Sequence, residues 1–339
     1  MNLTVASKHF QLPLKHPFTT SRYTVTVQNT IIVSITNGDF TGYGEATVNP
    51  YYNSTIEKLQ ASIESVRPII ENAHDVQPEQ LWQLLAPKLK DDYFALCAID
   101  CAYWDFYAKC KNKTLRSFWS NNDMFIPQSN YTIGIDAIEK MKQKIIETPW
   151  PVYKIKLGTN HDVAIVSELR KITDAVFRID ANCAWTVQET LDNAVELKEL
   201  EVEFIEQPLK ADAWKEMKIL KEKAVLPIIA DESCQRFEDV EACAEVFHGI
   251  NIKLMKCGGL TPALKMIEKA RQLNLKVMAG CMTESSIGIS NLVQIAPLLD
   301  YIDADGAMLL EEDIAKGITL RGGNIIYSTI NGSGAMLKI

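Results

Sequence analysis

Three acidic residues stand at matching places in consecutive segments of the sequence and could share one metal ion. Asp180, Glu206 and Asp231 each end a short apolar run, in "VFRID", "VEFIE" and "LPIIAD". Ligand sets made only of oxygen favour a hard cation such as Mg²⁺, and the lack of histidine at these positions argues against Zn²⁺. Each acid alone could instead cap a helix or form a turn, but such caps require no common register. We therefore predict one Mg²⁺ site.

Two lysines could act as acid and base on either side of this metal site. Lys156 belongs to the second and Lys253 to the sixth of eight predicted strands, which are roughly opposite points of a ring. A lysine becomes a base when burial or a nearby positive charge lowers its pKa. Lys154, on the same strand face as Lys156, supplies such a charge. The alternative is that lysine heads at this rim extend into solvent, which is the interpretation we favour for Lys256.

These residues need a scaffold that brings strand ends together. From about residue 127, strand-like segments alternate with helical patterns at intervals of about 22 to 26 residues, the length of one strand plus one helix. Eight such units predict a closed parallel barrel, whose active-site face is formed by the carboxyl ends of the strands. The eight segments are "NYTIGI", "VYKIKLG", "VFRIDAN", "VEFIEQP", "LPIIADES", "GINIKLMKCGG", "LKVMAGCMTE" and "YIDADG".

The remainder of the chain predicts a second domain. The first 60 or so residues are β-rich, with Asn37-Gly38 as a hairpin signal, and helical periodicity follows to about residue 117. "GITLRGGNIIYSTING" is typical of a β-hairpin that returns to this first part. We predict an α/β protein with an α+β domain over 1–125, a barrel over 126–312, and a returning C-terminal segment over 313–339.

Composition excludes several classes of function. The formal net charge of −8 over 339 residues argues against general binding to nucleic acid or to an anionic membrane. The N-terminus lacks the features of a signal peptide, and no apolar run is long enough to cross a bilayer. The eight cysteines show no CxxC pair, so reduced and mostly buried thiols are expected. We expect a cytoplasmic protein that forms a homo-oligomer.

With these residues in view, the sequence resembles the muconate-lactonizing-enzyme-like subgroup of the enolase superfamily over nearly its whole length. The matching motifs are "KIKLG", the acid trio with its "DE" pair, and "IKxxxxGG". The resemblance implies a modified TIM barrel, (β/α)7β, under an N-terminal capping domain that the C-terminal segment completes. It also implies removal of a proton α to a carboxylate, with Mg²⁺ stabilising the enolate. Lys156 and Lys253 would then be the acid/base pair of a racemase or epimerase.

Within this subgroup, "YIDADG" resembles the strand-eight motif of dipeptide epimerases. Asp303 and Asp305 share a strand face and call for a cationic partner, although an Asp-Gly turn is the structural alternative. In those enzymes the two acids hold the α-ammonium of a dipeptide substrate. Carried over position by position, the substrate contacts are Thr132, Lys154, Cys281, Thr283, Asp303 and Asp305.

The choice of dipeptide depends on loops of the capping domain. Well-known members act on L-Ala-D/L-Glu, a peptidoglycan fragment, through an arginine in the loop that reads "HPFTTSRYTVTV" here. Tyr23 takes that arginine's position and Arg22 falls one residue early. An apolar second residue is therefore an alternative to glutamate, and Tyr51 of "NPYYNST" could belong to the same lid.

Other activities stay open at this point. An o-succinylbenzoate synthase or N-succinylamino acid racemase would use the same machinery on an acylated, anionic substrate, which Asp303 and Asp305 would repel. A cycloisomerase of the same superfamily is another alternative, whereas the mandelate racemase branch lacks its histidine at strand seven. An enzyme of a different class, a Schiff-base aldolase, could also use a barrel lysine.

Overall fold

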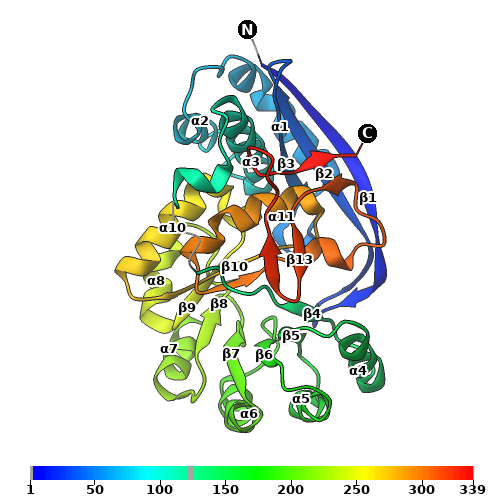
Figure 1. The fold of residues 1–339 in the computed structure, drawn as a ribbon. Coiled ribbons are helices and arrows are strands. Elements are labelled where there is room, and N and C mark those ends of the chain that lie inside the picture. The colour runs from blue at the N-terminus through cyan, green and yellow to red at the C-terminus, as the bar shows by residue number, and fades with distance from the viewer. Residues whose placement is uncertain (1–2, 121–124, 339) are drawn as a thin grey trace.

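The N-terminal part of the protein is an antiparallel sheet covered by helices. A computed structural model describes residues 3–120 and 125–338. The strands pair in the order β1-β2-β3, and α3 packs along the sheet (Figure 1). The elements of this domain are β1 (Thr4–Thr19), β2 (Thr24–Thr36), β3 (Thr41–Thr47), the 3₁₀ helix η1 (Pro50–Tyr52), α1 (Ile56–Glu71), α2 (Pro78–Leu85), α3 (Tyr93–Cys110) and the 3₁₀ helix η2 (Leu115–Phe118).

Local sequence explains the two tightest features of this domain. The β2–β3 turn is the predicted hairpin: Asn37 accepts backbone hydrogen bonds through its side chain, and Gly38 has a φ of 98°. On β3, Gly42 and Gly44 face α3, and a Cβ on either would overlap backbone atoms of that helix. The sheet and helix can approach closely because both positions lack a side chain.

The following segment forms the predicted barrel. All eight expected strands are present, and they pair in parallel in the order β11-β10-β9-β8-β7-β6-β5-β4. An isolated parallel bridge between Ser129 and Ile302 links the two ends of this order. The strands are β4 (Tyr131–Ile133), β5 (Val152–Lys156), β6 (Val176–Asp180), β7 (Val202–Glu206), β8 (Ile228–Ala230), β9 (Gly249–Ile252), β10 (Lys276–Gly280) and β11 (Tyr301–Asp303).

Helices surround this barrel, as Figure 1 shows for α4 to α8. Only a 3₁₀ helix follows β11, which agrees with the short or absent last helix of the sequence prediction. The elements are α4 (Ile138–Glu147), α5 (Asp162–Arg170), α6 (Val187–Glu199), α7 (Trp214–Lys223), α8 (Asp239–Val246), α9 (Leu254–Cys257), α10 (Leu260–Gln272), α11 (Ser286–Leu292), η3 (Val293–Leu298) and η4 (Gly306–Leu309).

The C-terminal residues run back toward the capping domain, as the red segment in Figure 1 shows. Gly332 forms a parallel bridge with Thr114, and the backbone NH of Ser333 donates to Asp105 of α3 at 2.7 Å. The predicted hairpin is the β13–β14 pair. The elements are β12 (Ala315–Lys316), β13 (Thr319–Arg321), β14 (Asn324–Ile326) and β15 (Met336–Leu337).

One apolar core continues from the capping domain into the barrel and includes residues of α3, α10 and the barrel strands. All eight cysteines are free thiols, and five are buried, in agreement with the sequence expectation. Among the described residues, no helix combines the length and apolar character needed to span a membrane.

Candidate active site

Asp180, Glu206 and Asp231 converge at the carboxyl end of the barrel. Asp180 ends β6, Glu206 ends β7, and Asp231 directly follows β8. The strand register places Asp180 beside Glu206 on one side and beside Lys156 on the other. The candidate ligand oxygens of the trio all lie within 4.8 Å of one another, and each residue is at most 1% exposed. Equivalent ends of adjacent parallel strands thus form one cluster of carboxylates.

The chemistry of this trio fits a divalent, oxygen-preferring cation. Burial and the neighbouring Asp180 raise the pKa of Glu206 to about 7. Its Oε2 lies 2.8 Å from Lys154 Nζ but accepts no hydrogen bond of acceptable geometry. Burial would also raise the pKa values of Asp180 and Asp231, but adjacent lysine ammonium groups hold both below their usual range. A buried site with three carboxylates and an under-satisfied oxygen is the donor set that Mg²⁺ binds.

Two lysines flank the trio from opposite sides of the barrel. Lys156, on β5, donates to Asp180 Oδ2 at 2.6 Å, and Lys253, just after β9, donates to Asp231 Oδ2 at 2.7 Å. Since β5 and β9 are four steps apart in an order of eight strands, the two amines approach the cavity from opposed walls. Burial lowers the pKa of Lys253, but the Asp231 carboxylate raises it above its usual value, which is the opposite of the lowered pKa that the sequence argument expects of a base.

Lys154 connects this trio to a second acidic group. Its Nζ lies 2.8 Å from Glu206, 3.1 Å from Asp303 and 3.2 Å from Asp180, and the side chain is 1% exposed. Burial lowers the pKa of Lys154, but these carboxylates raise it well above its usual value. Lys154 therefore remains an ammonium group that neutralises part of the buried negative charge.

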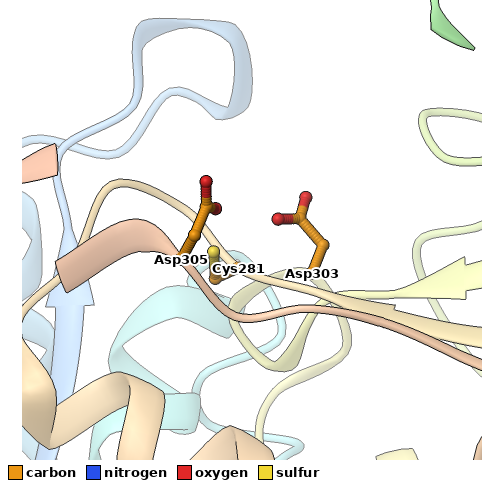
Figure 2. Close-up of side chains that lie close together, drawn as sticks. All are labelled: Cys281, Asp303 and Asp305. Carbon is orange, nitrogen blue, oxygen red and sulfur yellow. The ribbon is translucent and has the colours of Figure 1, made fainter. Parts of the chain in front are cut away.

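The second group contains Cys281, Asp303 and Asp305, which lie close together with both carboxyl groups directed to the same side (Figure 2). Thr132 donates to Asp305 through its backbone NH, and Asn130 donates to Asp303 at 2.9 Å. Burial and the neighbouring Asp303 raise the pKa of Asp305 well above its usual value. Lys154 lowers the pKa of Asp303 against the effect of burial. Two adjacent buried carboxyl groups with these opposed shifts favour a cationic ligand, which would stabilise the ionised form of both.

One cavity between the two domains joins these groups. All six sequence-predicted substrate contacts line it, whereas the acid trio is buried and lies outside the lining. Tyr52 lines this cavity, while the predicted lid residue Tyr51 stacks outside it over Arg22. The lining includes Arg22, Tyr23, Thr132, Lys154, Lys156, Lys253, Cys281, Thr283, Asp303 and Asp305.

One sequence prediction at this site is wrong, and one supporting residue was missed. Lys256, expected in solvent, is 3% exposed and donates to Asp231 Oδ1 at 2.5 Å. The short helix α9 turns it inward, so it supports the trio from below the rim. Asn251, which donates to Glu206 Oε1 at 2.8 Å, was not predicted. Its position two residues before Lys253, on the same strand face, was the available signal.

Two family comparisons cover most of the chain. Residues 136–337 match the family described as Enolase C-terminal domain-like. Residues 2–118 match the family described as Mandelate racemase / muconate lactonizing enzyme, N-terminal domain. The protein therefore belongs to the mandelate racemase / muconate lactonizing enzyme family of the enolase superfamily.

Similar proteins narrow the class of enzyme. The L-Ala-D/L-amino acid epimerase of Flavobacterium johnsoniae is 52% identical, over 97% of this chain and 98% of its own. A protein of the same name from a Maribacter species is 51% identical, over 99% and 100%. The structure of a dipeptide epimerase from Enterococcus faecalis V583, complexed with Mg and L-Leu-L-Tyr, is 27% identical with a TM-score of 0.93 and covers 99% of each chain. The protein is accordingly an isomerase of the epimerase class.

Proposed function

We propose that the protein is a Mg²⁺-dependent dipeptide epimerase that inverts the α-carbon of the C-terminal residue. The observation that carries this proposal is the pair of lysines, Lys156 and Lys253, that reach one buried carboxylate cluster from opposed walls. A carbon placed between them has an amine on each face. That arrangement suits inversion by removal of a proton from one side and return of a proton to the other.

Asp180, Glu206 and Asp231 would hold the metal ion, one per subunit. When bound, Mg²⁺ would withdraw charge from the substrate carboxylate and so make the α-proton more acidic. Lys154 would neutralise further negative charge at the same end of the substrate, since it already lies within 3.2 Å of two members of the trio.

Proton transfer is balanced between the two lysines. One lysine, as the neutral amine, takes the α-proton, and the electron pair of the C–H bond moves onto the carboxylate as an enediolate. The opposed lysine, as ammonium, then delivers its proton to the other face of the α-carbon. Each lysine ends in the protonation state that the other began with, so exchange with solvent restores the pair.

The other end of the cavity favours a free α-ammonium group. Asp303 and Asp305 lie close together in the cavity wall, and an ammonium group could bind beside both carboxyl groups with Thr132, Cys281 and Thr283 nearby. This favours a dipeptide over the acylated substrates of an N-succinylamino acid racemase or o-succinylbenzoate synthase. The second residue of the dipeptide would be glutamate or an apolar residue. The Flavobacterium johnsoniae and Maribacter relatives are both named for D/L-amino acids in general at this residue, which supports a subsite that accepts several side chains.

The test is solvent deuterium exchange. With Mg²⁺ and L-Ala-L-Xaa dipeptides in D₂O, the α-carbon of the second residue should gain deuterium and epimerise, as mass spectrometry and chiral chromatography would measure. N-acylated amino acids should exchange much more slowly.

Lys156→Ala and Lys253→Ala should each lower epimerisation by at least about 10³-fold, the upper range for a positioned acid or base. The exposed Lys215→Ala is the control. Absence of exchange in every dipeptide would reject the proposal.

We also propose, from the sequence, that the protein is cytoplasmic, forms a homo-oligomer and acts in the metabolism of peptidoglycan fragments.

A further inference from the structure

Arg22 joins the loop between β1 and β2 to the rim of the barrel. Its Nη2 lies 2.6 Å from Glu232 Oε1, and its Nη1 donates to the backbone carbonyl of Asn182 at 3.3 Å. The ring of Tyr51 covers the guanidinium at 4.4 Å, and Ser21 donates to the same carbonyl at 3.2 Å. The guanidinium of Arg22 therefore already contacts a carboxylate, a backbone carbonyl and an aromatic ring.

Within residues 3–120 and 125–338, the ion pair with Arg22 is the one direct contact that compensates the burial of Glu232. It directly follows Asp231, its side chain is 1% exposed, and it lines the cavity. Neither of its carboxylate oxygens accepts a well-directed hydrogen bond. A buried carboxylate in this state depends on a nearby cation, and Arg22 is the nearest one that the structure pairs with it.

The backbone segment that accepts the hydrogen bond from Arg22 has an unusual conformation. Asn182 and Cys183, which follow β6, have φ values of 45° and 67° although neither is a glycine. Two successive left-handed residues cost conformational energy, and such strain concentrates at functional sites. Here the turn presents the Asn182 carbonyl to both Ser21 and Arg22.

The Arg22–Glu232 pair lies opposite the ammonium end of the cavity. Asp303 belongs to β11, which is linked to β4 at the barrel seam, whereas Asn182 and Glu232 follow β6 and β8 across the ring. In a dipeptide whose ammonium meets Asp303 and whose carboxylate lies at the acid trio, the C-terminal side chain is the group left to point toward the capping loop. Arg22 of that loop and Glu232 line the same cavity, so they would lie next to this side chain.

We propose that Glu232 is a specificity-determining residue, because it neutralises Arg22 and so makes the subsite for the C-terminal side chain select uncharged over acidic side chains. This inference rests on the proposed dipeptide epimerase function. An acidic side chain would have to displace a buried carboxylate that already lies 2.6 Å from the guanidinium. It would also deprive the buried Glu232 of its ion pair with Arg22, so discrimination arises from repulsion as much as from attraction.

The experiment compares kcat/KM for epimerisation of L-Ala-L-Glu and L-Ala-L-Leu. Glu232→Gln removes the competing charge and leaves Arg22 free, so the Glu/Leu ratio should rise by about tenfold or more, as expected for one partly buried charge pair. Glu232→Asp keeps the charge and should retain a ratio near that of the parent enzyme. Glu238→Gln, an exposed acid on the same connection after β8, is the matched control and should leave the ratio unchanged.

A second variant keeps the test decisive if Glu232→Gln fails to fold. Arg22→Gln, on the capping loop, leaves Glu232 as an unpaired anion and should lower the Glu/Leu ratio several-fold below that of the parent enzyme. A Glu/Leu ratio that either folded variant leaves unchanged within twofold would overturn the inference, even though L-Ala-L-Leu is epimerised. Failure of the parent enzyme to exchange any dipeptide would instead reject the proposed function.

Discussion

At the scale of single residues, the site is a set of buried opposite charges that lie close together. Each carboxylate of the trio is within hydrogen-bonding or ion-pairing distance of at least one lysine. Such pairs contribute little net stability, because desolvation opposes their attraction, but removal of one partner leaves an uncompensated charge. The three carboxylates can therefore bind an additional cation such as Mg²⁺, and the affinity for that cation depends on pH.

Mg²⁺ binding is predicted to weaken as the pH falls below 7. Burial and Asp180 raise the pKa of Glu206 to about 7, so below this pH a proton must leave before the metal ion can bind. With one proton released, the affinity should be about tenfold lower at pH 6 than at pH 8. Isothermal titration calorimetry in buffers of different ionisation enthalpy would measure both the affinity and the proton release.

The raised pKa of Glu206 has the opposite effect on the stability of the metal-free protein, which should fall as the pH rises. A carboxyl whose folded-state pKa is raised contributes stability below its unfolded pKa and loses it as the pH rises through about 7. Glu206→Gln should remove both pH effects and weaken Mg²⁺ binding. Equal affinity of the parent protein at pH 6 and pH 8 would contradict this assignment.

At the same scale, sequence reveals the type and order of the site residues but not every orientation. Asp180, Glu206 and Asp231 were predictable because parallel strands deliver their last residues to one rim. The inward orientation of Lys256 was not predictable, because it depends on the single turn α9 and not on a strand face. The Arg22–Glu232 pair joins residues far apart in the chain, and no local pattern marks such a contact.

At the scale of elements, a buried carboxylate fixes the capping sheet to the barrel. Glu45, on β3, accepts from the backbone NH groups of Ser285 and Gly288 at the start of α11, at 3.0 to 3.1 Å, and from Thr30 Oγ1 at 2.9 Å. The donors at this helix start lie directly after the loop that carries Cys281. Glu45 therefore holds one wall of the cavity in place through α11.

Glu45→Ala is predicted to lower the free energy of unfolding by about 3 kcal/mol, because several buried donors lose their acceptor. The catalytic readout should be a raised KM, since in the proposed function the displaced loop would contact substrate. Urea unfolding followed by circular dichroism measures the first effect, and steady-state kinetics the second. Glu311→Ala, at an exposed acid, is the control, and a loss of less than about 1 kcal/mol for Glu45→Ala would argue against this role.

The ends of helices were easier to predict from local sequence than the contacts between helices and strands. Thr186 and Glu189 form the capping box at the start of α6 that their spacing predicts. A contact between domains, not local structure, explains why position 259 is a glycine. A Cβ at Gly259 would collide with Asp100 of α3. The sequence motif was visible, but the helix that requires it lies in the other domain.

At the scale of the whole molecule, the two domains are predicted to unfold as one cooperative unit. Trp104 of α3 donates to Thr261 of α10 at 2.8 Å, Asp100 accepts from the same threonine, and one apolar core spans both domains. Differential scanning calorimetry should give equal calorimetric and van't Hoff enthalpies. Mg²⁺ at 100 times its Kd should add about 2.7 kcal/mol of stability and raise the Tm of that single transition by roughly 5 °C. Asp180→Asn should abolish the shift without splitting the transition, whereas a Mg²⁺ shift confined to one of two separate transitions would show that the capping domain and barrel are independent.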